Sequence, residues 1–262
     1  MEQSIPKPSS AGISGSAPAL ERGLHILECL SRHHEGATLS EVSGELDLPK
    51  NSTLRLLQTL THSGYLARDE RSLRYRLTDK LLRIGQPRVR DISLVECALD
   101  AMKSLRDAVG ETAQLGIATG DEGVIIEKFE SNNAIRIGVE IGLRFPLHNN
   151  APGKILLAYR EPSDRELTLA RITLDRCTDR TITDVGALRK ECERVVTQGY
   201  ASDWGEADEG IHCVAAPVRE RSGRLVATVW VSGIAGRMPK SLFPSVAVHV
   251  VRGATEIERR LR

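Results

Sequence analysis

Residues 38–77, TLSEVSGELDLPKNSTLRLLQTLTHSGYLARDERSLRYRL, decide the fold of the N-terminal part of the chain. The stretch predicts two short helices joined by a tight turn. Its apolar residues recur at helical spacing, as Leu39, Val42 and Leu46 and then as Leu54, Leu57 and Leu60. Ser40 is placed to cap the first helix, Pro49 suits the first turn of the second, and Gly64 suits its C-terminal end.

After Gly64 the apolar period changes from that of a helix to two, which is typical of strands. Tyr65 and Ala67 are expected on the first strand, and residues 69–72 (DERS) form a turn. The returning strand carries Leu73, Tyr75 and Leu77. Two helices followed by a hairpin predict a winged helix-turn-helix.

Basic residues gather on this module. Residues 50–90 hold ten Lys and Arg against three Asp and Glu, a local net charge of +7 in a chain whose net charge is only +1. A solvated basic surface is the plain alternative. Because the charge coincides with the winged pattern, we favour DNA binding, which depends on neutralising phosphates.

The expected DNA contacts lie on the first turn of the second helix and in the wing. Arg55 is the best candidate to read guanine, while the wing arginines would reach phosphates or the minor groove. The residues assigned are Lys50, Asn51, Ser52, Thr53, Arg55, Arg71 and Arg74.

Length and composition limit the protein class. A chain of 262 residues accommodates two domains. Its five cysteines include no Cys-x-x-Cys pair, so we expect reduced thiols in a cytoplasmic protein. No apolar run approaches the ~20 residues of a membrane helix, so no membrane partner is expected. Residues 1–17 are rich in Ser, Pro and Gly and are expected to form a disordered tail.

The pattern beyond the tail predicts three parts: a winged module at residues 18–86, a linker helix at 87–108, and an α+β domain at 109–262. The expected helix faces are Leu20, Leu24, Leu27 and Leu30 in the first helix, Leu94, Ala98, Met102 and Leu105 in the linker, and Val250, Ala254, Ile257 and Leu261 in the last helix. Hairpins around residues 120–123 and 221–223, with a strand through Ile135, Ile137 and Val139, predict an antiparallel sheet. A further helix would be capped by Thr183 and closed by Gly199.

Several segments together resemble IclR-type bacterial transcriptional regulators over about residues 18–262. They are ALERGL at 19–24, LSEV at 39–42, LPKNSTLRLL at 48–57, GYL at 64–66, HNNAPGK at 148–154, GYA at 199–201 and GIHCVAAP at 210–217. The resemblance implies a GAF-like effector-binding domain after the linker helix. It also implies that a homodimer or a dimer of dimers binds a pseudo-palindromic double-stranded DNA operator.

The candidate ligand site is residues 146–158, PLHNNAPGKILLA. Pro152 fits the first turn of a helix, whose N-terminal N–H groups suit a carboxylate. A plain loop-to-helix junction with Lys154 in solvent is an equal alternative. The resemblance assigns effector contacts to Ala151, Pro152, Gly153, Asp203, Cys213, Trp230 and Ser232, with Ile137 as an apolar wall and Asn149 and Asn150 as nearby amides.

Trp230 stands where relatives often carry a small hydroxyl residue. Its indole would either shrink the pocket or offer a flat face to a ring, and simple core packing is an equal alternative. The resemblance implies a small organic or sugar acid as effector, and Trp230 favours one that is larger or more ring-shaped than a two- or three-carbon acid, such as a sugar acid.

Two other function classes stay open at this point. His148, Asp203 and Cys213 could form a catalytic set or, with His212, a metal site, but their spacing matches no known signature. We therefore assign no catalytic residue, metal ligand or cofactor. A helix-turn-helix that docks protein instead of DNA is the second alternative.

Overall fold

The computed structural model describes residues 17–33, 35–78, 80–85, 87–89 and 92–262. The expected tail (1–16), Asp79 and Arg90 lie outside the described residues. The chain divides into two compact units, one up to residue 86 and one from residue 87.

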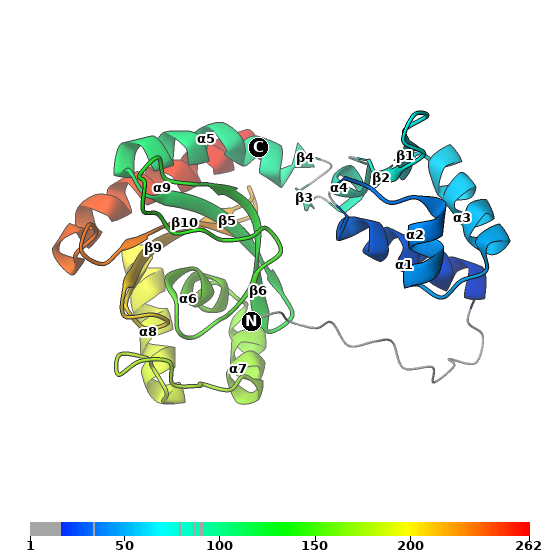
Figure 1. Cartoon of the computed structure of the whole chain (residues 1–262). Coiled ribbons are helices and arrows are strands. Elements are labelled where there is room, and N and C mark those ends of the chain that lie inside the picture. The colour runs from blue at the N-terminus through cyan, green and yellow to red at the C-terminus, as the bar shows by residue number, and fades with distance from the viewer. Residues whose placement is uncertain (1–16, 34, 79, 86, 90–91) are drawn as a thin grey trace. The chain divides into compact units, whose positions relative to one another are not determined.

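The first unit is a winged helix-turn-helix, as predicted (Figure 1). Three helices pack around one core, and a two-stranded antiparallel hairpin and a short helix follow. The elements are α1 (Pro18–Ser31), α2 (Leu39–Glu45), α3 (Lys50–His62), β1 (Leu66–Arg68), β2 (Tyr75–Leu77) and α4 (Lys80–Gly85). Gly64 follows α3 with φ +77°, a conformation that favours glycine and confirms its place at the helix end.

The cap of α2 differs from the prediction. Thr38, not Ser40, is the N-cap residue, and its hydroxyl accepts a hydrogen bond from the Glu41 N–H at 3.3 Å. The Glu41 carboxylate in turn accepts from the Thr38 N–H at 2.7 Å. This reciprocal capping box satisfies two N–H groups that the helix leaves without partners. Pro49 is likewise the N-cap of α3 and precedes its first turn.

The first strand of the hairpin is shifted by one residue from the predicted alternation, whereas the second strand follows it. Leu66 and not Ala67 is the buried residue of β1, at 2% exposure. On β2, Tyr75 is buried at 3% exposure and Leu77 packs against the same core, in the predicted phase. Leu73 lies in the turn with φ +56° and is 48% exposed. A period of two fixes alternation but not its phase, and the turn is longer than four residues.

Helix α1 buries only the C-terminal half of the predicted face. Leu30 is buried and Leu27 packs against the same core, with Ile26 and Cys29 beside them, whereas Leu20 and Leu24 are 64% and 51% exposed. Periodicity alone does not show where along a helix the partner surface ends.

The second unit is an α+β domain built on a six-stranded antiparallel sheet, in the order β7-β6-β5-β10-β9-β8. The strands are β5 (Thr112–Thr119), β6 (Glu122–Phe129), β7 (Arg144–Pro146), β8 (Ala201–Trp204), β9 (Ile211–Arg219) and β10 (Leu225–Ile234). Both predicted hairpins, β5–β6 and β9–β10, are present.

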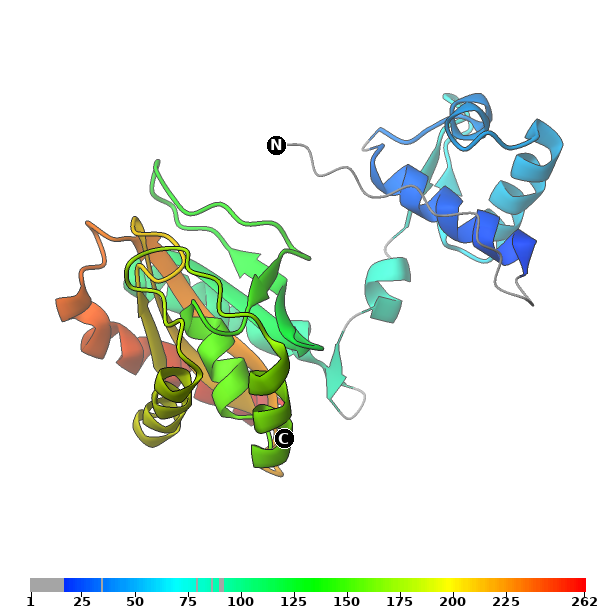
Figure 2. The same ribbon diagram turned by 90° about the horizontal axis from the view of Figure 1, so that it is seen from below.

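Helices cover both faces of the sheet. One face carries α5 (Leu94–Val109) and α9 (Phe243–Arg260), and the other carries α6 (Ala151–Ala158), α7 (Pro162–Arg171) and α8 (Val185–Gln198). Figures 1 and 2 show α6, α7 and α8 together on the face opposite α5 and α9. Short elements β3 (Arg88–Val89), β4 (Ile92–Ser93) and η1 (Lys240–Leu242) complete the unit.

The expected linker helix, α5, is part of the body of the second unit. Its predicted face of Leu94, Ala98, Met102 and Leu105 is at most 3% exposed. These side chains share a core with α9 and the central strands. The face was predicted correctly, but the helix is not a separate segment.

Two further details of the second unit differ from the predictions. Residues 135–139 form no strand. Asp184 instead of Thr183 caps α8, by accepting from the Ala187 N–H at 2.7 Å.

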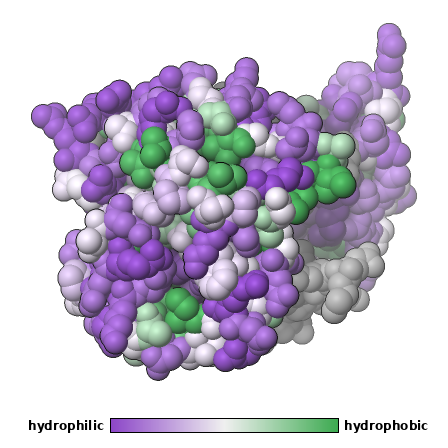
Figure 3. Space-filling view, turned by 90° about the vertical axis from the view of Figure 1, so that its left-hand side faces the viewer, coloured by the Kyte–Doolittle hydropathy of each residue, from purple (hydrophilic) through white to green (hydrophobic). Residues whose placement is uncertain are grey.

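Exposed apolar side chains such as Val248 are scattered, and Figure 3 shows small apolar patches on a mostly hydrophilic face.

We predict that Thr38→Ala lowers the free energy of unfolding of the N-terminal unit by about 1 kcal/mol, because it removes the capping hydroxyl of α2. Ser40→Ala is the matched control and should change it far less. Thermal or urea unfolding of the full chain measures both. Equal effects of the two substitutions would contradict the observed cap.

Candidate functional site

The first turn of α3 presents a cationic and polar surface. Lys50, Asn51 and Arg55 are exposed and Ser52 is half-buried. The opposite side of α3 is buried through Leu57, at 0% exposure, against α1 and α2. The helix therefore holds its exposed donors on one side, as a recognition helix requires.

Thr53 does not belong to this surface. Its side chain is 0% exposed, and its hydroxyl donates to the Pro49 carbonyl at 3.2 Å. The Ser43 hydroxyl donates to the Thr53 hydroxyl oxygen at 3.4 Å. The assignment of Thr53 to DNA was wrong, because the residue packs α3 against α2.

Arg74 is engaged within the protein. Its guanidinium donates to the Gly36 carbonyl at 2.6 Å and to both oxygens of the Glu41 carboxylate at 3.1 and 3.2 Å. This fork-shaped pair ties the wing to α2, so Arg74 is a positioning residue in this structure and not a free phosphate donor. Arg71 is exposed in the turn, and Arg76 on β2 is an exposed arginine that we did not assign.

Helix α6 is buried along its whole length. Its N-terminus is already capped: the Asn150 carbonyl oxygen Oδ1 accepts from the Gly153 N–H at 2.8 Å. Pro152 has no N–H, so among the first three residues only the N–H of Ala151 is left for another acceptor. The expected set of several free N–H groups was wrong.

Packing explains the residues around this turn. A Cβ at Gly153 would lie 2.4 Å from the Pro146 carbonyl oxygen, so only glycine fits. The Asn150 amide donates to the Pro146 carbonyl at 2.8 Å and to Asn149 Oδ1 at 2.9 Å. The Asn149 amide in turn contacts Cys177 Sγ at 3.2 Å. Both asparagines are therefore engaged in holding the turn.

The sheet face beneath α6 carries a chain of buried polar groups. Cys213 Sγ lies 3.2 Å from Ser232 Oγ, which accepts from the Gln114 amide at 2.9 Å. Gln114 was missed by sequence reasoning, although strand alternation places it on the same face as Thr112. The Thr112 hydroxyl donates to the Ile137 carbonyl at 2.9 Å, which brings half-buried Ile137 to this region through its backbone.

Asp203 joins these residues because its strand position pairs with Cys213. Its Oδ1 accepts from the N–H groups of Gly205 and Glu206 at 3.0 and 2.7 Å. Burial raises the pKa of Asp203 to about 7, against the lowering effect of those N–H groups. Burial and the Asp203 charge also raise the pKa of the Cys213 thiol. Cys213 is thus a thiol in this structure and not a nucleophilic thiolate.

Lys154 is not in solvent. Its side chain is 1% exposed and its ammonium lies 2.6 Å from Glu206 and 3.2 Å from Glu191. Glu206 Oε2 is buried without a hydrogen-bond partner, and burial raises the pKa of this carboxyl although Lys154 opposes the shift. This charged cluster lies beside Asp203, and sequence reasoning did not predict it.

Trp230 is buried at 2% exposure and packs in the same cluster as Ile155 and Cys213. Its ring meets Phe145 edge-on with centroids 5.6 Å apart. A Cβ at Gly116 would lie 3.0 Å from the indole, so the strand leaves just enough room for it. These contacts favour space filling over an open stacking face.

The imidazoles of the catalytic and metal alternatives, His148 and His212, each contact a backbone carbonyl oxygen. His148 Nε2 lies 3.1 Å from the Asp175 carbonyl oxygen. His148, Asp203 and Cys213 are not among the side chains that could together hold a metal ion in the described part of the chain.

In the described part of the chain, no helix is long and apolar enough to span a membrane.

We predict that the free energy of unfolding falls as pH rises between about 4 and 7. The folded state keeps the Asp203 proton up to about pH 7, whereas the unfolded state loses it near the ordinary value of 3.8. The stabilisation is therefore fully present below the unfolded pKa and is lost as pH rises through the folded pKa. Asp203→Asn should flatten this slope in thermal unfolding, and exposed Asp179→Asn should leave it unchanged. An unaltered slope in Asp203→Asn would contradict the assignment.

Comparison with known proteins finds matches to both units of the chain. A family model described as the bacterial transcriptional regulator IclR C-terminal matches residues 87–259, and the IclR helix-turn-helix domain matches residues 19–70. The HTH-type transcriptional regulator BhcR of Paracoccus denitrificans (strain Pd 1222) is 33% identical over 244 residues, which cover 93% of this chain and 87% of BhcR.

Other relatives agree. The HTH-type transcriptional regulator KdgR of Escherichia coli (strain K12) is 35% identical over 207 residues, which cover 79% of this chain and 78% of KdgR. The crystal structure of the Thermotoga maritima IclR superposes with a TM-score of 0.78 at 27% identity, and covers 93% of this chain and 98% of that one. These relatives are transcriptional regulators and not enzymes. With its winged helix-turn-helix and its α+β domain, the chain belongs to the IclR family of DNA-binding bacterial transcriptional regulators.

Proposed function

We propose that the protein is a cytoplasmic regulator that binds a pseudo-palindromic operator as a homodimer or a dimer of dimers. A small organic or sugar acid switches its affinity for that operator. The observation that carries the DNA part is the one-sided cationic surface of α3, with Lys50 and Arg55 exposed and Leu57 buried behind them.

The assigned DNA contacts after correction are Lys50, Asn51, Ser52, Arg55 and Arg71. Arg55 has no partner among the described side chains that would compete with a base or a phosphate. A guanidinium can bind guanine with two parallel hydrogen bonds, whereas Lys50 and Arg71 suit phosphates. Exposed Arg76 on the wing is also assigned to phosphate contacts.

The proposed pairing of subunits rests on the length of DNA that one winged module can read. Leu20 and Leu24 line an apolar cavity of about 1050 Å³ in the first unit, but Asn51, Ser52 and Arg55 line it as well, so we do not assign this cavity to a partner subunit. A single winged module reads only a few base pairs, so two modules on two half-sites give the site length an operator needs.

The effector would lie between the start of α6 and the polar face formed by Asp203, Cys213 and Ser232. The Ala151 N–H and the hydroxyl of Ser232 are donors for an acid, and Asp203 in its protonated form adds a third. Trp230 narrows the space, which favours a compact acid. The effector shifts DNA binding only by the difference in its affinity for the two arrangements of the dimer.

We predict that Arg55→Ala weakens binding to the specific operator by about 5-fold to 150-fold, since a bidentate base contact contributes roughly 1–3 kcal/mol. Competition gel shifts with the duplex upstream of the protein's own gene measure the ratio. Thr53→Val should retain base preference, and Arg221→Ala, an exposed arginine of the second unit, should bind like the wild type. If the protein binds no duplex, the module docks another macromolecule instead.

We predict that one class of acid raises the melting temperature in a panel of keto acids, sugar acids and aromatic acids. Ser232→Ala should reduce that rise, because it removes a donor at the site, and exposed Ser104→Ala should not. Stabilisation by pyruvate-sized acids alone would rule out the larger, ring-shaped effector expected from the sequence, and stabilisation by none of these acids would contradict the proposed effector class. A rise of the same size in Ser232→Ala would place the ligand elsewhere.

A further inference from the structure

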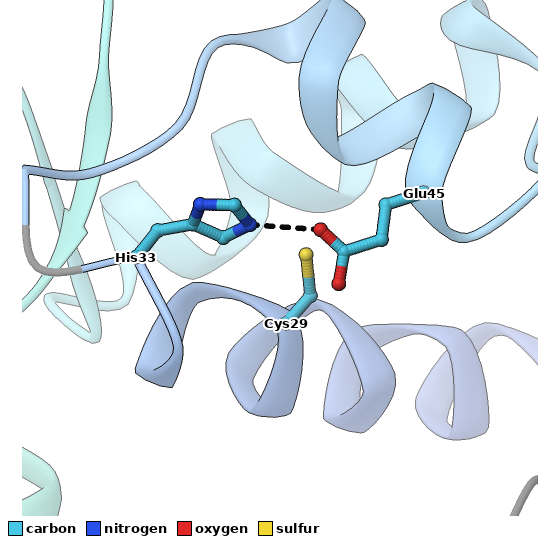
Figure 4. Close-up of side chains that lie close together, drawn as sticks. All are labelled: Cys29, His33 and Glu45. Atoms are coloured by element: carbon cyan, nitrogen blue, oxygen red, sulfur yellow. Dashed lines mark hydrogen bonds and ion pairs between the residues drawn. The ribbon is translucent and has the colours of Figure 1, made fainter. Parts of the chain in front are cut away.

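Three side chains of metal-ligand type meet at the ends of α1 and α2. Cys29 lies on the last turn of α1, His33 lies two residues beyond the end of that helix, and Glu45 faces both from the last turn of α2 (Figure 4). One ligand atom from each lies within 4.8 Å of the other two. Among the residues that the structure describes, this is the one such group of three or more.

We propose that Cys29, His33 and Glu45 bind a zinc ion, with water as the fourth ligand. A thiolate, an imidazole and a carboxylate form a mixed sulfur, nitrogen and oxygen set that suits zinc, whereas magnesium and calcium prefer oxygen alone. Around a tetrahedral zinc the ligand atoms lie about 3–4 Å apart. The three atoms already approach that arrangement, so small side-chain rotations complete the site.

A cation would enter an existing contact. His33 Nε2 and Glu45 Oε2 are 2.8 Å apart, and an ion between them would replace the hydrogen of this contact. The Cys29 thiol loses its proton when it binds zinc, so zinc uptake releases a proton.

Arg32 orients the carboxylate without occupying the metal position. Its Nη2 lies 2.6 Å from Glu45 Oε1, the oxygen that does not face His33. It therefore acts as an outer partner that holds Glu45 in place, as hydrogen-bonded neighbours of metal ligands commonly do. The same contact leaves Glu45 Oε2 turned toward His33, where the ion would bind.

The position of the site links it to the DNA-reading surface. Glu45 closes α2, and Asp47, two residues later, has φ +50° in the turn that leads into α3. An ion held by α1 and α2 would stiffen the frame from which α3 projects. Because zinc would bind the folded unit in preference to the unfolded chain, it would stabilise that unit by mass action.

The test uses the full chain with Zn²⁺ and, as a spectroscopic probe, Co²⁺. We expect one zinc per chain after equilibrium dialysis and a rise in melting temperature with zinc. We also expect a thiolate-to-cobalt charge-transfer band in the near ultraviolet. Cys29→Ser and His33→Gln should lose the band and the zinc-dependent rise, while Cys177→Ser and His25→Gln should keep both.

If Cys29→Ser fails to fold, the half-exposed His33→Gln and the exposed Glu45→Gln decide the outcome. A chain that binds no stoichiometric zinc would overturn the proposal. So would a cobalt band that persists in Cys29→Ser or disappears in Cys177→Ser.

Discussion

The burial of Thr53 and Leu57 determines which side of α3 reaches solvent. Both side chains are 0% exposed, and Leu57 shares a core with residues of α1, α2 and the hairpin. Lys50 and Arg55 must then lie outward, because a helix repeats every 3.6 residues. The ion pair between Arg74 and Glu41 extends the same constraint to the wing. A DNA-reading surface thus follows from packing on the opposite side of the helix.

In the second unit, burial determines the partners of the polar groups instead of which side of a helix reaches solvent. Helix α6 is buried on all sides, so each polar group near it needs a partner inside the protein. Lys154 finds Glu206 and Glu191, and Asp203 finds backbone N–H groups. A region with so many interdependent buried polar groups responds strongly when a ligand changes one of them. We regard this as the physical basis for the proposed sensing role.

Sequence periodicity predicted the parts that depend on local rules. Gly64 and Gly199 end helices as expected, and the apolar faces of α5 and α9 are buried as expected. Local rules failed where the partner surface mattered: the first strand of the hairpin is shifted by one residue, and α1 leaves Leu20 and Leu24 outside the core. The positions of Tyr65 and Leu20 depend on the partner surface, which periodicity does not contain.

The candidate site was least predictable where partners are distant along the chain. Arg74 meets Glu41 across 33 residues, and Lys154 meets Glu206 across 52 residues. Nothing in the neighbourhood of either basic residue indicates that it is neutralised. The assignment of Thr53 to DNA failed for a related reason, because a hydroxyl on the first turn of a helix suits both a DNA contact and a packing contact. The family resemblance identified Cys213 and Ser232 as site residues but not Gln114. Gln114 is recognised only in the structure, where it contacts Ser232.

The most direct test of the central claim is the salt dependence of duplex binding by the full chain. The logarithm of the association constant should fall linearly with the logarithm of salt concentration, because each phosphate contact releases condensed counterions. Replacing exposed Arg71 with alanine should reduce the magnitude of that slope by roughly one. A flat salt dependence, or no association with any duplex at low salt, would contradict the account.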